Sequence, residues 1–335
     1  MKIDRFFAGY FTGEVPFGPA IYEHKAYLID RYPSEIAREE ELLYQALREE
    51  FSLYKADLLT VGVDVYNVEA EALGCEVRYF EDSPDVPVIV KPILKNEKEL
   101  EGLTIPDPSR AGRMPLILRA GKRIKTFLEG EEVVVRGAIS GPFTLASRLI
   151  GQETLLRKSL LEPDYVKDLL QFCAQVGKEY GRAWLEAGLS PIVFDSLASP
   201  PTISPRLYRQ LVLPFHKVLL HSFRGECPPA HLPLIIGGET TPIAEDIAQT
   251  GANLILCDYN ADLGKYLEVA RSNQLFLRVN LDPDLVRNGP RKEIFSSGER
   301  VLERGSDYPR LVLGTGVLPY DTPKENVLVL RELSA

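Results

Sequence analysis

Short apolar runs alternate along the chain with longer stretches whose apolar residues recur at the spacing of a helix. The runs are continuously apolar, which indicates parallel strands buried on both faces. They lie at residues 20–22, 58–61, 133–135, 192–194, 234–236, 254–256, 275–277 and 311–313. Eight strand–helix units predict an α/β fold, a (β/α)8 TIM barrel. The sequence has no Gly-rich phosphate turn of the kind an open doubly wound sheet carries, which favours the barrel.

Helix signals lie between the runs. Pro163 opens a helical pattern that continues to Trp184, and Gly188 suits the end of that helix. Three dipeptides place a capping residue before a proline at the first helical position: Ser204-Pro205, Thr241-Pro242 and Thr322-Pro323. Thr322 with Glu325 also fits a capping box. We predict one domain over residues 1–335 with an elaborated N-terminal region, because the proline-rich residues 79–128 exceed one strand–helix unit.

The charge balance is acidic, with 39 Lys+Arg against 48 Asp+Glu and a formal net charge of −9. Proteins that bind nucleic acid or membrane surfaces concentrate positive charge, so neither partner is expected. No apolar run approaches the ~20 residues that cross a bilayer. The N-terminal residues do not resemble a secretory signal, and the four cysteines form no CxxC pair. These features predict a cytoplasmic protein without disulfides.

Polar and ionisable residues follow the predicted strands, at the end where barrel enzymes hold their active sites. They include Tyr22, Glu23, His24, Asp64, Tyr66, Asn67, Ser140, Asp195, Ser196, Glu239, Asp258, Tyr259, Asn280 and Thr315. Several also have a structural explanation. Asp195 could cap the turn that follows it, and Asp258 could cap the helix that follows it. Glu239 could favour the adjacent helix N-terminus, and Glu23-His24 could be a surface pair. His216 is predicted within a helix, where a hydrogen-bonded histidine is commoner than a ligand.

Five segments together resemble the uroporphyrinogen decarboxylase superfamily. They are residues 141–147 (GPFTLAS), 194–198 (FDSLA) with 203–205 (ISP), 240–243 (TTPI), 280–283 (NLDP) and 321–326 (DTPKEN). Within that superfamily, residues 68–74 (VEAEALG) and 321–326 are similar to the corrinoid-linked methyltransferase branch. The resemblance implies a (β/α)8 barrel that moves a methyl group to or from the cobalt of a corrinoid.

The chain departs from both branches at their functional motifs. The decarboxylases carry an Arg-Gln-Ala-Gly-Arg stretch where residues 19–26 read PAIYEHKA, and a Gly-His-Gly turn where Thr315 stands. Porphyrinogen decarboxylation is therefore not expected. The thiol-methylating branch holds zinc with a His-x-Cys pair and a later Cys, and the corresponding residues are Ile235, Gly237 and Thr315. That zinc site is not expected either, although Asp195, His216 and Glu239 could form a different metal site.

The resemblance predicts an enzyme that moves a methyl group from a small donor, such as a methoxylated aromatic ether, to a corrinoid. The corrinoid is expected on a partner protein, because the chain has no cobalamin-binding Asp-x-His-x-x-Gly segment. The residues expected to assist the leaving group are Glu239, Asp195, His24 and Tyr22. Those expected to contact substrate are Glu23, Asn67, Asp258, Tyr259, Asn280 and Thr315.

Two other functions stay open. A lyase acting on a smaller carboxylate would need Arg136 and Arg278 to face the barrel mouth together. A barrel that only docks a corrinoid protein would have a shallow or filled mouth. For an enzyme, we predict a cavity at the C-terminal ends of the strands, faced by Glu239, Asp195 and at least one of Tyr22, Glu23 and His24.

Overall fold

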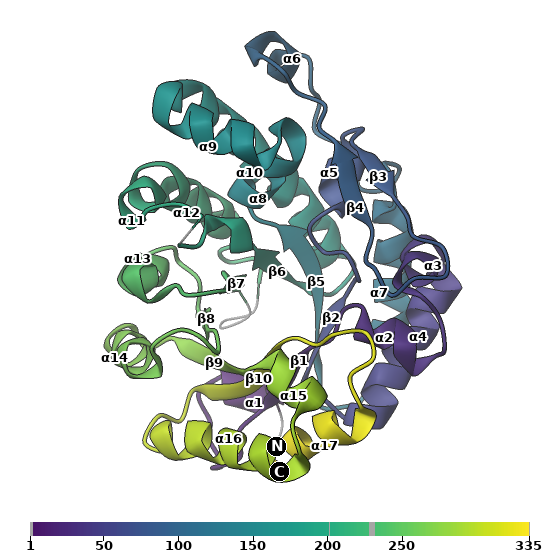
Figure 1. The fold of residues 1–335 in the computed structure, drawn as a ribbon, viewed down its shortest axis with the longest axis vertical. Helices are drawn as coiled ribbons and strands as arrows, with labels where there is room; N and C mark the ends of the chain where they lie inside the picture. The colour runs from purple at the N-terminus through teal and green to yellow at the C-terminus, as the bar shows by residue number, and fades with distance from the viewer. Residues whose placement is uncertain (1–2, 201, 228–231, 335) are drawn as a thin grey trace.

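The computed structural model describes residues 3–200, 202–227 and 232–334. Eight parallel strands follow the order β1-β10-β9-β8-β7-β6-β5-β2 and curve into a barrel (Figure 1). They are β1 (Phe17–Ala20), β2 (Leu58–Val61), β5 (Val134–Ser140), β6 (Ser190–Phe194), β7 (Pro233–Ile235), β8 (Leu254–Cys257), β9 (Phe276–Leu281) and β10 (Leu311–Val317). The end strands β1 and β2 meet where the Asp57 N–H donates to the Phe17 carbonyl over 2.8 Å. The predicted (β/α)8 barrel is confirmed.

Three strands continue beyond the apolar runs that predicted them. β5, β9 and β10 extend to Ser140, Leu281 and Val317. Side chains alternate along a strand, so Arg278 and Asn280 face the barrel interior while Val279 packs outside. Because polar residues occupy interior-facing positions near the ends of these strands, the apolar runs in the sequence are shorter than the strands themselves.

Helices surround the barrel on its outside (Figure 1). The longer ones are α4 (Glu40–Tyr54), α7 (Met114–Phe127), α8 (Pro142–Ile150), α9 (Gln152–Leu161), α10 (Pro163–Glu186), α12 (Leu213–His221), α14 (Leu263–Asn273), α16 (Arg291–Arg304) and α17 (Lys324–Ser334). The shorter ones are α1 (Ile3–Phe7), α2 (His24–Leu28), α3 (Pro33–Arg38), α5 (Val68–Ala72), α6 (Glu97–Glu101), α11 (Pro205–Leu207), α13 (Ala244–Ala248) and α15 (Pro283–Asn288). None of the helices in the described ranges has the length and apolar character needed to cross a membrane.

The predicted helix starts have different outcomes. α10 begins at Pro163 as predicted, and the Ser204 side chain caps α11 by accepting from the Leu207 N–H over 3.2 Å. The Thr322 capping box is wrong, because the Thr322 hydroxyl donates backward to the Pro319 carbonyl over 2.8 Å. Thr241 is also not a cap: it begins a 3₁₀ turn (Thr241–Ile243), and its hydroxyl accepts from the Asp262 N–H.

The barrel interior is a separate apolar cluster that α1 closes from the N-terminal end of the strands. Phe6 and Phe7 of α1 pack against Phe276 at the start of β9, with ring centroids 5.2 and 4.9 Å apart. The opposite, C-terminal end of the strands is not closed in this way. The fold therefore leaves one open mouth, at the end where barrel enzymes work.

Residues 79–128, predicted as an elaboration, join β2 to β5 together with α5 and β3 (Glu76–Arg78). β3 pairs antiparallel with β4 (Val88–Lys91) in a two-stranded sheet outside the barrel. α6 follows this hairpin, and Figure 1 shows it projecting from the body of the protein. α7 then packs against α4, β2 and β5, as an outer helix of the barrel does.

Candidate functional site

A cavity of about 260 Å³ lies at the C-terminal ends of the strands. It is lined by Ala20, Tyr22, Tyr66, Phe194, Ser196, Ile235, Gly237, Leu256, Asp258, Tyr259, Arg278, Asn280, Pro283, Gly316 and Val317. Larger hollows lie elsewhere: about 510 Å³ at the N-terminal end of the barrel, 760 Å³ beside α9, 430 Å³ beside α16 and 320 Å³ between the segment before β1 and the end of α16. Barrel enzymes place their chemistry at the C-terminal ends, so the smaller cavity is the candidate site.

Three hydroxyl groups line one side of the cavity. The hydroxyl oxygens of Tyr66 and Ser196 are 2.9 Å apart and share a hydrogen bond, and Ser196 also accepts from the Gly237 N–H over 3.3 Å. Tyr22 and Tyr66 both set their rings edge-on to Phe194. Burial raises the pKa of both phenols, so each keeps its proton near neutral pH. Both can therefore donate a hydrogen bond to a bound molecule.

A chain of polar contacts forms the other side. Arg278 Nε donates to Asn280 Oδ1 over 3.0 Å, and Asn280 Nδ2 donates to Asp258 Oδ1 over 2.9 Å. Asp258 Oδ2 accepts from the Gly238 N–H over 2.8 Å. Arg278 Nη2 donates to the Thr315 carbonyl over 3.0 Å. Protein contacts hold the Asp258 carboxylate on both oxygens, while the Arg278 guanidinium adjoins the cavity.

The prediction that Asp195 faces the cavity is wrong. Its carboxylate accepts from the N–H groups of Phe143 and Thr144 at the start of α8, from the Thr144 hydroxyl, and interacts with His216 Nε2 over 2.8 Å. Phe194 points into the barrel, and Asp195, the residue directly after β6, points outward to the helices. Asp195 thus caps α8, which lies earlier in the chain, and joins it to α12. Its side chain does not cap the turn that follows it, contrary to the alternative explanation.

His24 also lies away from the cavity, which corrects its predicted placement. Its imidazole is fully buried between Tyr54 on α4 and the Tyr320 carbonyl, at 2.7 and 2.9 Å. Burial lowers the pKa of His24 to about 4, so the ring is neutral. Glu23 is half-buried at the start of α2, where burial raises its pKa, and it does not line the cavity.

Glu239 does not line the cavity, and its carboxylate accepts from the Thr241 N–H over 3.1 Å. The three predicted metal ligands therefore do not converge, because Asp195 and His216 bind each other while Glu239 holds the following turn. Within the described ranges, no three His, Cys, Asp or Glu side chains come together as a metal site would require. The predicted ligand set of His216, Glu239 and Asp195 is thus corrected.

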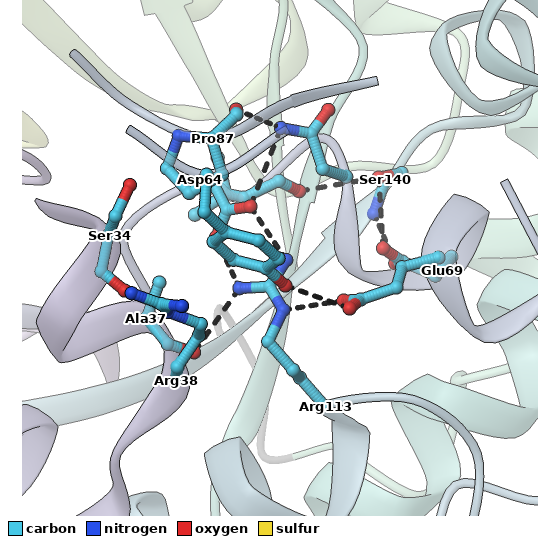
Figure 2. A network of polar contacts seen from close by, with 12 residues as sticks. Ser34, Ala37, Arg38, Asp64, Glu69, Pro87, Arg113 and Ser140 are labelled. Carbon is cyan, nitrogen blue, oxygen red and sulfur yellow. Dashed lines mark hydrogen bonds and ion pairs between the residues drawn. The ribbon is translucent and has the colours of Figure 1, made fainter. Parts of the chain in front are cut away.

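Two predicted contact residues serve the fold instead. Asn67 Nδ2 donates to the Pro87 carbonyl over 2.6 Å, within the polar network around Arg113 (Figure 2). Thr315 Oγ1 accepts from the Ala20 N–H over 3.1 Å, in the seam between β1 and β10. The other predicted contact residues, Asp258, Tyr259 and Asn280, do line the cavity.

Three cavity residues were not among the predicted site residues. Tyr66 and Ser196 follow predicted strands, and Arg278 directly follows the predicted run at 275–277, two positions before Asn280. That spacing of two places both side chains on one face. Arg136, the second arginine considered for a lyase, does not line the cavity: it lies deeper, over the Phe7 ring. The two arginines thus do not face the mouth together.

The positions that hold zinc in the thiol-methylating branch lie at this cavity. Ile235 and Gly237 line its wall, and Thr315 adjoins it on β10. None of the three provides a thiolate or an imidazole, which are the ligands such a site needs. The residues present therefore do not fit the zinc ion of that branch.

Residues 5–334 match the profile of the uroporphyrinogen decarboxylase (URO-D) family. The chain belongs to this family. Among its relatives, the methylcobamide:CoM methyltransferase MtaA of Methanosarcina barkeri is 29% identical over 266 residues, 78% of this chain and 75% of that protein. MtbA of Methanosarcina mazei, also a methylcobamide:CoM methyltransferase, is 30% identical over 268 residues, 79% of this chain and 75% of that protein.

Other URO-D family members are also similar. The uroporphyrinogen decarboxylase of Trichodesmium erythraeum is 25% identical over 316 residues, 90% of this chain and 85% of that protein. A solved methyltransferase from Methanosarcina mazei superposes with a TM-score of 0.86 at 24% identity, covering 99% of this chain and 97% of the other. The solved structure supports the barrel fold. The predicted resemblance to the corrinoid-dependent branch of the superfamily is confirmed.

Proposed function

We propose that this URO-D family member transfers a methyl group from a small donor to a corrinoid carried by a partner protein. The relatives named methylcobamide:CoM methyltransferases support methyl transfer with a corrinoid. The choice of donor rests on the cavity wall. Hydroxyl groups line it, and Ile235 and Gly237 occupy positions where the thiol-methylating branch has zinc ligands. We infer that the donor is a methyl ether, whose leaving atom is an oxygen.

The cavity sets the size of the donor. A volume of about 260 Å³ is below the ~300–1,000 Å³ typical of pockets for drug-sized ligands, so a tetrapyrrole does not fit inside. The apolar side chains of Phe194, Ile235 and Leu256 suit a ring or a short carbon chain. A corrinoid macrocycle must stay outside, above the rim formed by Tyr259 and Val317, which are 48% and 44% exposed.

Tyr22 and Tyr66 are the residues we assign to the leaving group. When the methyl group departs, the ether oxygen keeps the electron pair of the broken bond and becomes an anion. A neutral phenol held beside it can donate a hydrogen bond, and a site shielded from water strengthens that bond. The reduced corrinoid supplies the nucleophile, so the chain itself needs only to orient the donor and stabilise the oxygen.

The test is a donor panel. The chain is incubated with a reduced corrinoid protein and methoxylated aromatics, methylamines or betaines, and methylation is followed by the absorbance of the corrinoid. We expect turnover with a methoxylated aromatic, and a loss of about 10²-fold or more in the rate for Tyr66→Phe or Tyr22→Phe. The matched control is Tyr10→Phe, because Tyr10 is exposed and does not line the cavity. No methylation with any donor would refute the proposal, and turnover of methylamines alone would refute the ether.

A further inference from the structure

Arg278 is a buried cation that no carboxylate of the described residues contacts directly. It is 6% exposed and lines the cavity, and it donates hydrogen bonds to the Asn280 side chain and the Thr315 carbonyl. A guanidinium carries five N–H donors, so these two bonds leave three. Burying a charge without a counterion is costly, and a fold normally supplies one.

The only other charged side chain on the cavity wall, within the described residues, is Asp258. It does not pair with Arg278, because Asn280 lies between them and bonds to both. Both of its oxygens already accept hydrogen bonds, from Gly238 and from Tyr259 and Asn280. Asp258 therefore fixes the position of Arg278 through Asn280 without neutralising it by contact.

The barrel makes room for this arginine. Gly314 on β10 lies opposite Asn280, and a Cβ there would fall 2.5 Å from Arg278 Nε and 2.8 Å from Asn280 Oδ1. Any larger residue would displace the guanidinium from its place. A second buried arginine, Arg136, lies deeper in the barrel, where its Nε and Nη2 have no hydrogen-bond partner among the described residues, and adds positive potential below the cavity.

The contacts of Arg278 also place its charged group. The strand register sets the Arg278 backbone level with Leu256 and Val312, and its side chain reaches along the strands to Gly314 and the Thr315 carbonyl. A group bound to the guanidinium thus lies against β9 and β10, below the rim where Tyr259 and Val317 stand. The other end of the same molecule can then extend to the mouth, where a corrinoid on a partner protein must approach.

We propose that the molecule occupying this cavity carries a carboxylate that pairs with Arg278, and that this pairing points its methyl group outward. This inference rests on the proposed function and narrows its donor to a small methoxylated carboxylic acid. A guanidinium matches a carboxylate with two parallel hydrogen bonds, which supplies both affinity and direction.

The experiment is calorimetric binding of 4-methoxybenzoate and of 4-methoxybenzamide, which has nearly the same shape without the charge. The wild-type chain should prefer the acid by about 10- to 100-fold, as expected for hydrogen bonds to a charged group. Arg278→Gln should abolish that preference. Arg278→Lys should retain part of it, because lysine keeps the positive charge but cannot form two parallel hydrogen bonds to a carboxylate.

Arg136→Gln is the matched control, since it removes the same charge from the same barrel without touching the cavity wall. It should keep most of the preference, and circular dichroism should show that all variants fold. The inference is overturned if wild type binds acid and amide equally, if it does not bind the acid at millimolar concentration, or if Arg136→Gln and Arg278→Gln behave alike.

The donor panel separates this inference from the proposed function. Binding of the acid through Arg278 without methyl transfer supports the inference and contradicts the function. Methyl transfer from neutral ethers, with no preference for acids, contradicts the inference and leaves the function intact.

Discussion

Two buried arginines in this barrel have opposite surroundings. Arg113 donates to both oxygens of Asp64, over 2.9 and 2.7 Å (Figure 2). Its Nε also contacts Glu71. Arg278 contacts an amide and a carbonyl and no carboxylate. Burial lowers the pKa of both guanidiniums, but at Arg113 the two carboxylates more than reverse that effect and raise it. At Arg278 the lowering prevails.

The comparison distinguishes charged side chains that are paired within the protein from Arg278, which has no carboxylate in contact with it. The Arg113 network ties the start of α7 to the segments after β2. Asp195 with His216, and His24 with Tyr54, are satisfied in the same way by protein partners. Among the described residues, Arg278 and the deeper Arg136 are exceptions, and of these two only Arg278 borders the cavity. Incomplete pairing beside a cavity is thus a better guide to a binding site than a charged residue after a strand.

The largest expected effect is on stability at Arg113. Arg113→Gln should lower the free energy of unfolding by about 3–5 kcal/mol, because it leaves the Asp64 carboxylate buried without its cation. Arg278→Gln should change it by less than about 1 kcal/mol, since losing two hydrogen bonds is offset by removing a desolvated charge. Urea denaturation followed by fluorescence of the only tryptophan, Trp184, measures both. Equal losses would erase the distinction between the two arginines.

The next effect is a pH dependence at His24. Its pKa is about 4 in the fold and about 6.5 when unfolded, so below pH 6.5 only the unfolded chain takes up the proton. Stability should therefore fall as the pH drops from about 6.5 to about 4, by about 3 kcal/mol more than in His24→Gln.

Unfolding of both chains in urea between pH 4 and pH 7 gives this difference. Glu50 and Glu69, whose pKa burial raises to about 7, titrate in the same range with the opposite sign. They are common to both chains and cancel in the comparison. Parallel pH profiles would mean that His24 is exposed to solvent, contrary to its buried position.

Replacing Asp195 should lower the stability of the fold and leave ligand binding unchanged. Asp195→Asn should cost about 2 kcal/mol, because an amide cannot accept from the start of α8 and from His216 with both of its ends. The affinity for 4-methoxybenzoate should stay within about twofold of wild type, since Asp195 does not line the cavity. A large loss of affinity with unchanged stability would return Asp195 to the binding site. Thermal unfolding and calorimetry are measured on the same preparation.

The smallest expected effect comes from displacing the Arg278 side chain. Gly314→Ala should cost about 1–2 kcal/mol in stability and displace the guanidinium, so 4-methoxybenzoate should bind about three- to tenfold more weakly. Gly102→Ala is the control, because a Cβ there meets only ordinary contacts at 3.6 Å. Unchanged binding by Gly314→Ala would show that the guanidinium does not depend on the space this glycine leaves.

The sequence by itself determined the barrel. Continuous apolar runs separated by helical patterns specify buried parallel strands, because hydrophobic burial acts on each segment locally. The end of the barrel that holds the site followed from that architecture, and Tyr22, Asp258, Tyr259 and Asn280 lie on the cavity wall.

Only the tertiary structure decided which residues after the strands face inward. Phe194 and Ser196 line the cavity while Asp195 between them points to α8, because side chains alternate and a shift of one residue exchanges inside for outside. His24 lies away from the mouth because its imidazole hydrogen-bonds to Tyr54, which is 30 residues away in the sequence. Whether Arg278 has a counterion depends on where Asn280, Thr315 and Gly314 meet across two strands. That meeting depends on the register between strands, which no local pattern records.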